Sequence, residues 1–436
     1  MDTKSYKRSR IMYIIEAALE YLISILVADM YLAALTRELG ISESLTGIIS
    51  SFISLGCVFQ LCSLLIRKAR PKRLVMALSI LNQLLFMLLY VVPLTGWNPN
   101  VKIIVFVVVI LLAYFFYNIA HPKKIDWFMS LVDNEQRGTF TAKKEAISLV
   151  VGVVFTFAMG AVIDYYKETN IKTAFIICGI SIFALTILHT LTMIFTIDKQ
   201  KNEVCENCDA NEPKSNIFSV FKDKSIIKVT LVFVLWYIAS YTAIPFYGAY
   251  KEGALAFSYT FGAVLGVIYA IARAFFSFVW GKYADKYSFA KMLRICFGIA
   301  AIGFLINVFC VPENGHVIYT IFYICYAIAM GGINSALINL CYDYVSKERR
   351  ADALAVSLAV AGVCGFLATL VVSPLVSYIQ GNSNMLFGIH IYAQQVLSLI
   401  ACVMTIVALL YVSISLTKVK RIDRDEENEQ NSDKHA

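Results

Sequence analysis

Charged residues are scarce in this chain. Only 16% of its 436 residues are Asp, Glu, Lys or Arg, whereas soluble domains usually contain about 25%. Hydrophobic residues make up 59%, and many occur in runs of the roughly 20 residues that a helix needs to cross a bilayer. This composition excludes an ordinary soluble protein and predicts an all-α membrane protein, because a helix satisfies its own backbone hydrogen bonds in lipid.

Motifs for catalysis and cofactor binding are also missing. The sequence contains no phosphate-binding P-loop, no HExxH zinc motif and no nucleophile elbow. We therefore expect neither an enzyme nor an ATP-driven pump, and no cofactor or metal. The eleven cysteines do not resemble a disulfide framework, since nine lie in or beside apolar runs. Cys205 and Cys208 form one CxxC in a polar loop, which is a weak metal or redox signal.

Twelve apolar stretches predict twelve transmembrane helices. The basic start of the chain precedes a stretch that is too long for a cleaved signal peptide, so we expect a retained first helix. The stretches are 11–36, 43–66, 74–94, 101–120, 145–164, 173–197, 227–250, 257–281, 289–311, 317–341, 352–379 and 388–416.

The placement of Lys and Arg predicts the orientation. If the N-terminus is cytoplasmic, 32 of the 38 basic residues fall in cytoplasmic segments, five fall in outer loops, and Arg273 lies within a span. Cytoplasmic loops of membrane proteins carry this excess. We therefore expect a multi-pass protein of the plasma membrane with both termini in the cytoplasm. The same distribution explains the net charge of +8 without nucleic acid.

A charged segment divides the chain into two halves. We expect an N-terminal six-helix bundle (1–197), a cytoplasmic linker (198–226), a C-terminal six-helix bundle (227–417) and a disordered cytoplasmic tail (418–436). The halves resemble each other: residues 135–137 read EQR, and residues 348–350, 213 positions later, read ERR. The same offset relates Arg73 to Lys286. These matches indicate a six-helix unit that is used twice.

Two motifs resemble those of a known family. Residues 281–291, GKYADKYSFAK, resemble the major facilitator signature G-x-x-x-D-[RK]-x-G-x-[RK]-[RK], although Ser288 replaces a glycine. An earlier copy at 67–73, RKARPKR, keeps the positive charge but lacks the glycine and the aspartate. Residues 127–138, WFMSLVDNEQRG, are similar to the W-x-x-D-L-V-P-E-x-x-R-G stretch of bacterial members.

The resemblance implies the major facilitator fold, with two pseudo-symmetric six-helix bundles and transport by alternating access. In the family, the signature aspartate contacts the start of helix eleven, which assigns that role to Asp285. We expect Gly281 to let helix eight end tightly. The alternative is an ordinary basic cytoplasmic loop. The gating residues implied by the resemblance are Gly281, Asp285, Lys286, Arg73, Arg137 and Arg350.

Ionisable residues inside the predicted spans are candidates for coupling, because each costs roughly 2.5–3.5 kcal/mol to insert at a bilayer centre. Glu16 and Glu20 share a face of the first helix. Glu20 and Arg273 each lie about 13 Å from the same predicted membrane edge, so we expect an ion pair or two substrate-facing side chains. Glu16 and Glu20 are close enough to form a proton site, because two neighbouring carboxylates do not both ionise easily. The alternative is that Glu16 lies at the cytoplasmic edge of the membrane and Glu20 only pairs structurally with Arg273. Asp29 is a further candidate, although it and Asp164 lie near the outer rim.

Aromatic and amide side chains of three spans predict a cavity for a polar organic solute with an apolar side, such as a sugar or nucleoside. Ordinary helix packing is the alternative reading of each residue. His189, alone in the sixth span, is interpreted as packing. The cavity candidates are Tyr114, Tyr117, Asn118, Trp236, Tyr237, Tyr241, Asn334 and Asn339.

Taken together, these features predict a secondary active transporter of a small organic solute, with proton symport as the specific hypothesis. Multidrug efflux is an alternative, weakened because the fourth span lacks an arginine and the fifth lacks a Gly-Pro pair. A non-transporting membrane sensor or receptor on the same fold is a further alternative. The expected partners are the solute, protons and the lipid bilayer, and we expect a monomer.

Overall fold

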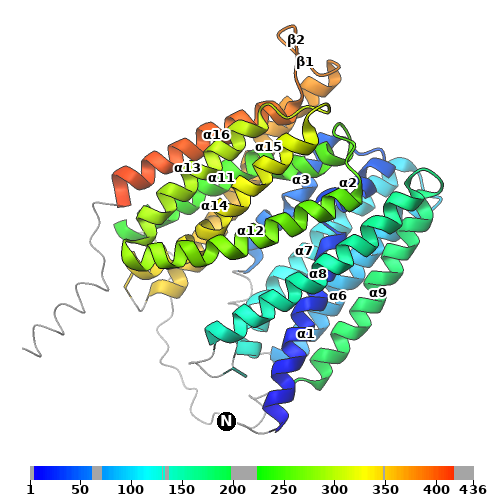
Figure 1. The fold of residues 1–436 in the computed structure, drawn as a ribbon. Coiled ribbons are helices and arrows are strands. Elements are labelled where there is room, and N and C mark those ends of the chain that lie inside the picture. The colour runs from blue at the N-terminus through cyan, green and yellow to red at the C-terminus, as the bar shows by residue number, and fades with distance from the viewer. Residues whose placement is uncertain are drawn as a thin grey trace, which may run out of the picture. The chain divides into compact units, whose positions relative to one another are not determined.

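The structure is a computed structural model that describes residues 4–60, 71–129, 131–132, 137–197, 223–346 and 349–416. Its helices form two compact units, which Figure 1 shows as ribbons. Unit 1 contains the chain up to Glu212 together with Gly248–Gly266, and unit 2 contains Pro213–Tyr247 and the chain from Val267 onward. The predicted linker up to residue 222, the predicted tail from residue 418 and the Cys205–Cys208 motif lie outside the described residues.

In unit 1, α1 packs on α8 and α9, and α6 packs on α7 and α9. The first two helices are separated by a break at which Asp29 has a positive φ of 51°, a conformation that Asp adopts more readily than most residues. The elements are α1 (Lys4–Leu26), α2 (Asp29–Glu38), α3 (Glu43–Ser50), α4 (Phe52–Gly56), η1 (Cys57–Phe59), α6 (Pro71–Val91), η2 (Val92–Leu94), α7 (Pro99–Met129), α8 (Arg137–Lys167) and α9 (Ile171–Phe195).

Unit 2 packs α13 against both α14 and α16. Two long helices, α11 (Lys224–Glu252) and α12 (Tyr259–Lys286), belong mostly to unit 2. The C-terminal end of α11 and the N-terminal end of α12 belong to unit 1. The remaining elements are α13 (Phe289–Asn307), α14 (Gly315–Tyr344), α15 (Arg350–Gly381), the hairpin of β1 (Met385–Leu386) and β2 (Ile389–His390), α16 (Ala393–Tyr411) and the π-helix η6 (Val412–Leu416).

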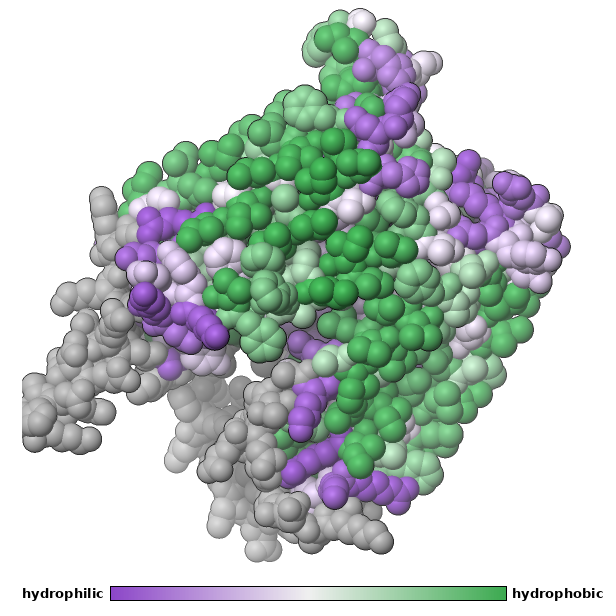
Figure 2. All heavy atoms as spheres, viewed as in Figure 1, coloured by the Kyte–Doolittle hydropathy of each residue, from purple (hydrophilic) through white to green (hydrophobic). Residues whose placement is uncertain are grey.

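The described helices agree with most of the predicted spans. Ten are long and apolar enough to cross a membrane. Together, α1 and α2 pass the same test, but they are bent by 41° at their break, as a broken span or a re-entrant segment would be. The second predicted span begins as the shorter apolar stretch Glu43–Phe59, and its continuation from residue 61 lies outside the described residues. Hydrophobic side chains cover the helix faces in Figure 2, with hydrophilic residues toward the helix ends. Such a surface suits hydrocarbon rather than water.

Two local predictions need correction. Gly281 does not end its helix, because α12 continues to Lys286 and a Cβ at this position would meet nothing within 4 Å. The first predicted span is not one straight helix, because the chain breaks between Leu26 and Asp29. The eight described cysteines form no disulfide with one another. Burial raises the pKa of the Cys310 thiol, in the α13–α14 connection, to about 12, which makes it unreactive.

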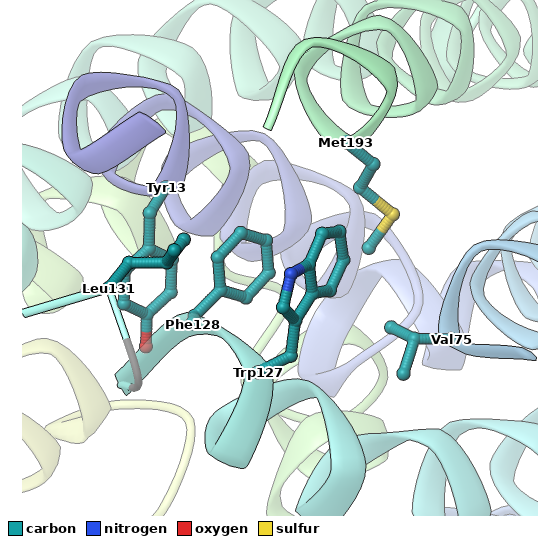
Figure 3. Packing of buried hydrophobic residues seen from close by; sticks show 6 residues of the cluster. All are labelled: Tyr13, Val75, Trp127, Phe128, Leu131 and Met193. Atoms are coloured by element: carbon teal, nitrogen blue, oxygen red, sulfur yellow. The ribbon is translucent and has the colours of Figure 1, made fainter. Parts of the chain in front are cut away.

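An aromatic cluster ties α1, α6, α7 and α9 together (Figure 3). The Tyr13 ring stacks on Phe128 with centroids 4.2 Å apart, and Phe128 stacks on Trp127 at 4.6 Å. The indole N–H of Trp127 also donates to the carbonyl of Ile197 at 3.0 Å. The other members of this cluster are Val75, Leu131 and Met193.

Replacing Trp127 by Ala should therefore weaken the N-terminal helices. Trp127 is 4% exposed, and truncation of a buried aromatic residue typically costs about 3–5 kcal/mol. We expect a clear fall in the thermal unfolding temperature of the detergent-solubilised protein. Trp97→Ala is the matched control, because Trp97 is 49% exposed. An equal fall for both variants would show that Trp127 has no special part in this packing.

Candidate functional site

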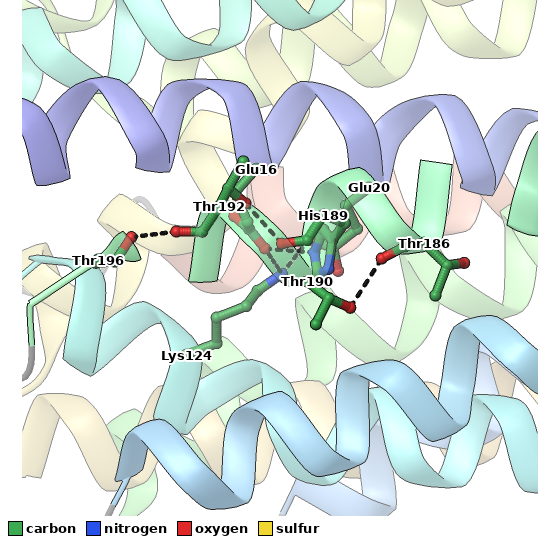
Figure 4. A network of polar contacts seen from close by, with 8 residues as sticks. All are labelled: Glu16, Glu20, Lys124, Thr186, His189, Thr190, Thr192 and Thr196. Atoms are coloured by element: carbon green, nitrogen blue, oxygen red, sulfur yellow. Dashed lines mark hydrogen bonds and ion pairs between the residues drawn. The ribbon is translucent and has the colours of Figure 1, made fainter. Parts of the chain in front are cut away.

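Three helices of unit 1 bring four ionisable side chains together in the interior. Glu16 and Glu20 come from α1, Lys124 from α7 and His189 from α9. Figure 4 shows Lys124 extending toward the glutamates, with His189 on the opposite helix. We call these four residues the charge cluster. On each helix a member of the aromatic cluster lies one turn away: Tyr13 precedes Glu16, while Trp127 and Met193 follow Lys124 and His189. The aromatic packing thus positions the charges.

The charge cluster centres on the carboxylate of Glu16. The Lys124 ammonium donates to Glu16 Oε1 at 3.0 Å and also contacts Glu20. The Nε2 atom of His189 lies 2.9 Å from the same Oε1 atom. Exposed side-chain fractions are 1% for Glu16, 7% for Lys124 and 0% for His189, against 23% for Glu20. Charges so deeply buried persist only when they are paired.

The cluster has more negative than positive charge. With both glutamates ionised, two carboxylates face one ammonium, so a single additional proton makes the group neutral. Within the described part of the chain, Glu16 Oε2 and His189 Nδ1 are buried and have no hydrogen-bond partner. The roles of the two atoms in the His189–Glu16 hydrogen bond depend on the histidine tautomer, and an ionised Glu16 requires the tautomer in which Nε2 donates. The geometry therefore provides an excess of one negative charge and, at Glu16 Oε2, a position at which a proton can bind.

Two members of the cluster were missed by the sequence analysis. Lys124 lies beyond the predicted fourth span, 101–120, and was therefore among the 32 basic residues placed in cytoplasmic segments, but α7 extends to Met129 and buries this side chain. His189 was interpreted as packing, but it bonds to Glu16. The apolar residues that continue past Lys124, including Trp127, were the available signal that the helix had not yet ended. Nothing in the spacing identified the partner of His189.

The remaining coupling candidates lie elsewhere. Glu20, which the sequence paired with Arg273, has Lys124 as a partner in its own unit. Arg273 lies on α12 and is half-buried. Asp29 is not a plain rim charge, because it accepts from the ammonium of Lys251. Asp164 likewise has specific partners, which are the backbone N–H groups of Tyr259 and Thr260.

A second imidazole extends the cluster along α7. The ring centroids of Tyr117 and His121 are 5.1 Å apart. Both side chains interact electrostatically with Glu16, Glu20 and Lys124. His121 Nδ1 is buried and has no partner among the described residues. Tyr117 is thus a predicted cavity residue that interacts electrostatically with the charge cluster.

The other predicted cavity residues pack between helices. In unit 1, Asn118 donates to the Tyr114 carbonyl at 2.8 Å and accepts from Gln60 at 3.1 Å. In unit 2, Trp236 stacks on Phe297 with centroids 5.4 Å apart. The other four positions of unit 2 are less buried. Tyr237 and Tyr241 stack on each other with centroids 5.5 Å apart, Asn339 donates to the Ser335 carbonyl, and Asn334 is half-buried.

The predicted gating residues occupy helix ends. Arg350 donates to the carbonyls of Val345 and Tyr342, and so caps the C-terminus of α14. Asp285 and Lys286 are exposed at the end of α12, and Arg73 is exposed near the start of α6. Arg137 begins α8, and its side chain lies outside the described part of the structure. The contact of Asp285 with the start of helix eleven stays a prediction.

The charge cluster also satisfies one distance criterion for a metal site. Potential ligand atoms of Glu16, Glu20 and His189 all lie within 4.8 Å of one another. The Lys124 ammonium contacts both carboxylates, so a positive charge already occupies the place that a cation would take. The arrangement is therefore better suited to protons than to a metal ion.

Comparison with known proteins agrees with this architecture. A family model described as Major Facilitator Superfamily matches residues 11–369. No curated protein matches the chain. A mutant of the nucleoside transporter NupG is 14% identical, covers 93% of this chain and 99% of its own, and has a TM-score of 0.70.

Two further solved structures are similar in fold. A bacterial homologue of the human lysosomal transporter Spinster is 11% identical, with coverages of 94% and 97% and a TM-score of 0.69. A D-xylose–proton symporter is 13% identical, with coverages of 93% and 96% and a TM-score of 0.64. At these identities the likeness concerns the fold alone.

Proposed function

Because the chain belongs to the Major Facilitator Superfamily, we propose that it is a secondary active transporter rather than an enzyme. It moves a small polar organic solute, such as a sugar or a nucleoside, across the plasma membrane by alternating access in symport with protons. Both chain termini lie in the cytoplasm.

The charge cluster carries the coupling part of this proposal. Its two carboxylates and one ammonium bind one proton to reach neutrality, and burial makes each change of protonation energetically costly unless a second charge or a conformational change accompanies it. We assign that proton to the buried Glu16 Oε2 atom, which has no hydrogen-bond partner among the described residues. A purely structural ion pair would have equal numbers of opposite charges and saturated hydrogen bonds.

The solute class rests on the side chains beside the cluster and on the similar structures. Tyr117 and His121 provide aromatic faces next to polar groups, which suits a sugar or a nucleobase. A nucleoside transporter and a D-xylose–proton symporter share the fold. These names belong to the similar proteins, and they select the first solutes to test.

Uptake into proteoliposomes tests the proposal. The full chain should accumulate tritiated uridine or D-xylose when the outer solution is one pH unit more acidic than the lumen. One pH unit corresponds to about 1.4 kcal/mol per proton, which permits up to about tenfold accumulation by one-proton symport. A protonophore should abolish this accumulation.

Protein-free liposomes and liposomes without a pH gradient serve as controls. Uptake that equilibrates but never exceeds the outer concentration, with or without the gradient, would contradict proton coupling. Uptake of neither solute would contradict the proposed solute class. Accumulation only with the opposite gradient would favour export.

A further inference from the structure

The segment that joins α11 to α12 belongs to unit 1, although most of both helices belongs to unit 2. Residues Gly248–Gly266 contain the last turn of α11, the connection and the first turns of α12. Three acidic and three basic side chains of unit 1 meet at this segment, and these interactions are separate from the charge cluster.

Asp164, near the end of α8, holds the start of α12 through both carboxylate oxygens. Oδ1 accepts from the backbone N–H of Tyr259 at 2.7 Å, and Oδ2 accepts from the N–H and the hydroxyl of Thr260 at 2.8 and 2.7 Å. The first N–H groups of a helix have no partner within the helix, and the helix dipole favours a negative charge there. Asp164 thus caps α12 from another helix.

Two sets of ion pairs precede this cap along the segment. Lys251, with a side chain that is 4% exposed, donates to Asp29 at the α1–α2 break. Glu252, 5% exposed, accepts from Arg37 at 2.9 and 3.0 Å and lies 3.4 Å from the Lys167 ammonium. If the segment separates from the other helices of unit 1, water can take the place of each of these polar contacts. Separation of a large apolar interface would have no such compensation.

Close backbone approaches complete the junction. A Cβ at Gly248 would lie 2.7 Å from the Asp29 carbonyl oxygen, and a Cβ at Gly160 would lie 3.1 Å from the Tyr259 carbonyl group. At both positions the nearest atoms are backbone, so a larger residue requires the helices to move apart. The junction is therefore a specifically fitted contact.

We propose that Asp164 is a positioning residue of a latch, formed with the Asp29–Lys251 and Arg37–Glu252–Lys167 ion pairs, that must release the α12 N-terminus in each transport cycle. The proposal rests on transport by alternating access. It does not depend on proton coupling or on the identity of the solute.

Hydrogen–deuterium exchange of the full chain in nanodiscs tests the contact without any solute. Asp164→Asn removes the charge and an acceptor, so we expect exchange of a peptide covering 255–266 to rise about tenfold. Peptides from α6 and α7 should exchange as in the wild type, and Asp164→Glu should retain part of the protection. Glu168→Gln is the matched control, because Glu168 is exposed on the same stretch of chain. Unchanged exchange in Asp164→Asn would overturn the latch.

A cross-link tests the need for release. Asp164→Cys combined with Thr260→Cys should form a disulfide on oxidation, since the native side-chain atoms lie 2.7 Å apart. The solute for this assay is uridine or D-xylose, whichever the wild type exchanges. Its counterflow should stop in the oxidised protein and recover with reductant. The two single-cysteine variants should not respond to oxidation. Failure to cross-link would refute the geometry, and full counterflow in the cross-linked protein would refute the role. Loss of proton coupling alone would leave counterflow intact, so the two proposals fail separately.

Discussion

Glu16→Gln should abolish acid-driven accumulation of the solute while leaving solute counterflow in place. The substitution leaves Glu20 and Lys124 as one negative and one positive charge, so the charge cluster is neutral without an added proton. The variant therefore resembles the protonated state at every pH. Accumulation under a gradient of one pH unit should fall from as much as about tenfold to equilibration.

Counterflow measures exchange without net proton movement, so it separates loss of coupling from loss of folding. Glu38→Gln is the matched control, because Glu38 is an exposed glutamate of α2 in the same unit. The proton-coupling proposal would be falsified if Glu16→Gln accumulated solute as the wild type does. Equal loss of counterflow and accumulation would instead assign Glu16 to solute binding or to folding.

Lys124→Met should destabilise the protein strongly, and Glu16→Gln should partly reverse this effect. Removal of the ammonium leaves two carboxylates facing each other, one of them fully buried. Removal of one partner of a buried ion pair typically costs about 3–5 kcal/mol. In the double variant only Glu20 remains charged, and it is the more exposed of the two glutamates. The unfolding temperatures of the four proteins form a double-mutant cycle.

Lys123→Met is the matched control, because Lys123 precedes Lys124 on α7 but is only half-buried. Its unfolding temperature should stay close to that of the wild type, because an accessible lysine contributes little to stability. Additive effects of Lys124→Met and Glu16→Gln would show that the two side chains are not coupled. That result would remove the electrostatic basis of the proposed proton site.

The sequence predicted individual helices better than it predicted their contacts. Ten predicted spans correspond to single described helices, because hydropathy is a property of consecutive residues and hydrocarbon requires it over about 20 of them. The break before Asp29 was missed, because residues 11–36 form one apolar stretch and the interruption depends on the backbone conformations of Ala28, which is extended, and Asp29, which has a positive φ. Gly281 was assigned to a helix end, but a glycine within a helix of the bilayer does not have to end it.

The candidate site was half predicted. Glu16 and Glu20 were recognisable because carboxylates are rare in apolar runs and their spacing of four places them on one helix face. Lys124 and His189 were not recognised, because they lie 108 and 173 positions from Glu16. Asp164 was interpreted as a rim charge. Its partners are backbone N–H groups, which nearly every residue has, so the sequence contains no signal that identifies them.

The sequence alone determined that this chain is a membrane protein of many helices, and it predicted the orientation, because apolar length and the placement of Lys and Arg are local quantities. Only the tertiary structure decided that Glu16 meets Lys124 and His189, and that Asp164 caps α12. The physical reason is that nearly every face of a transmembrane helix is apolar. Hydropathy therefore cannot select which faces meet, and that choice depends on close packing and on the pairing of a few polar groups.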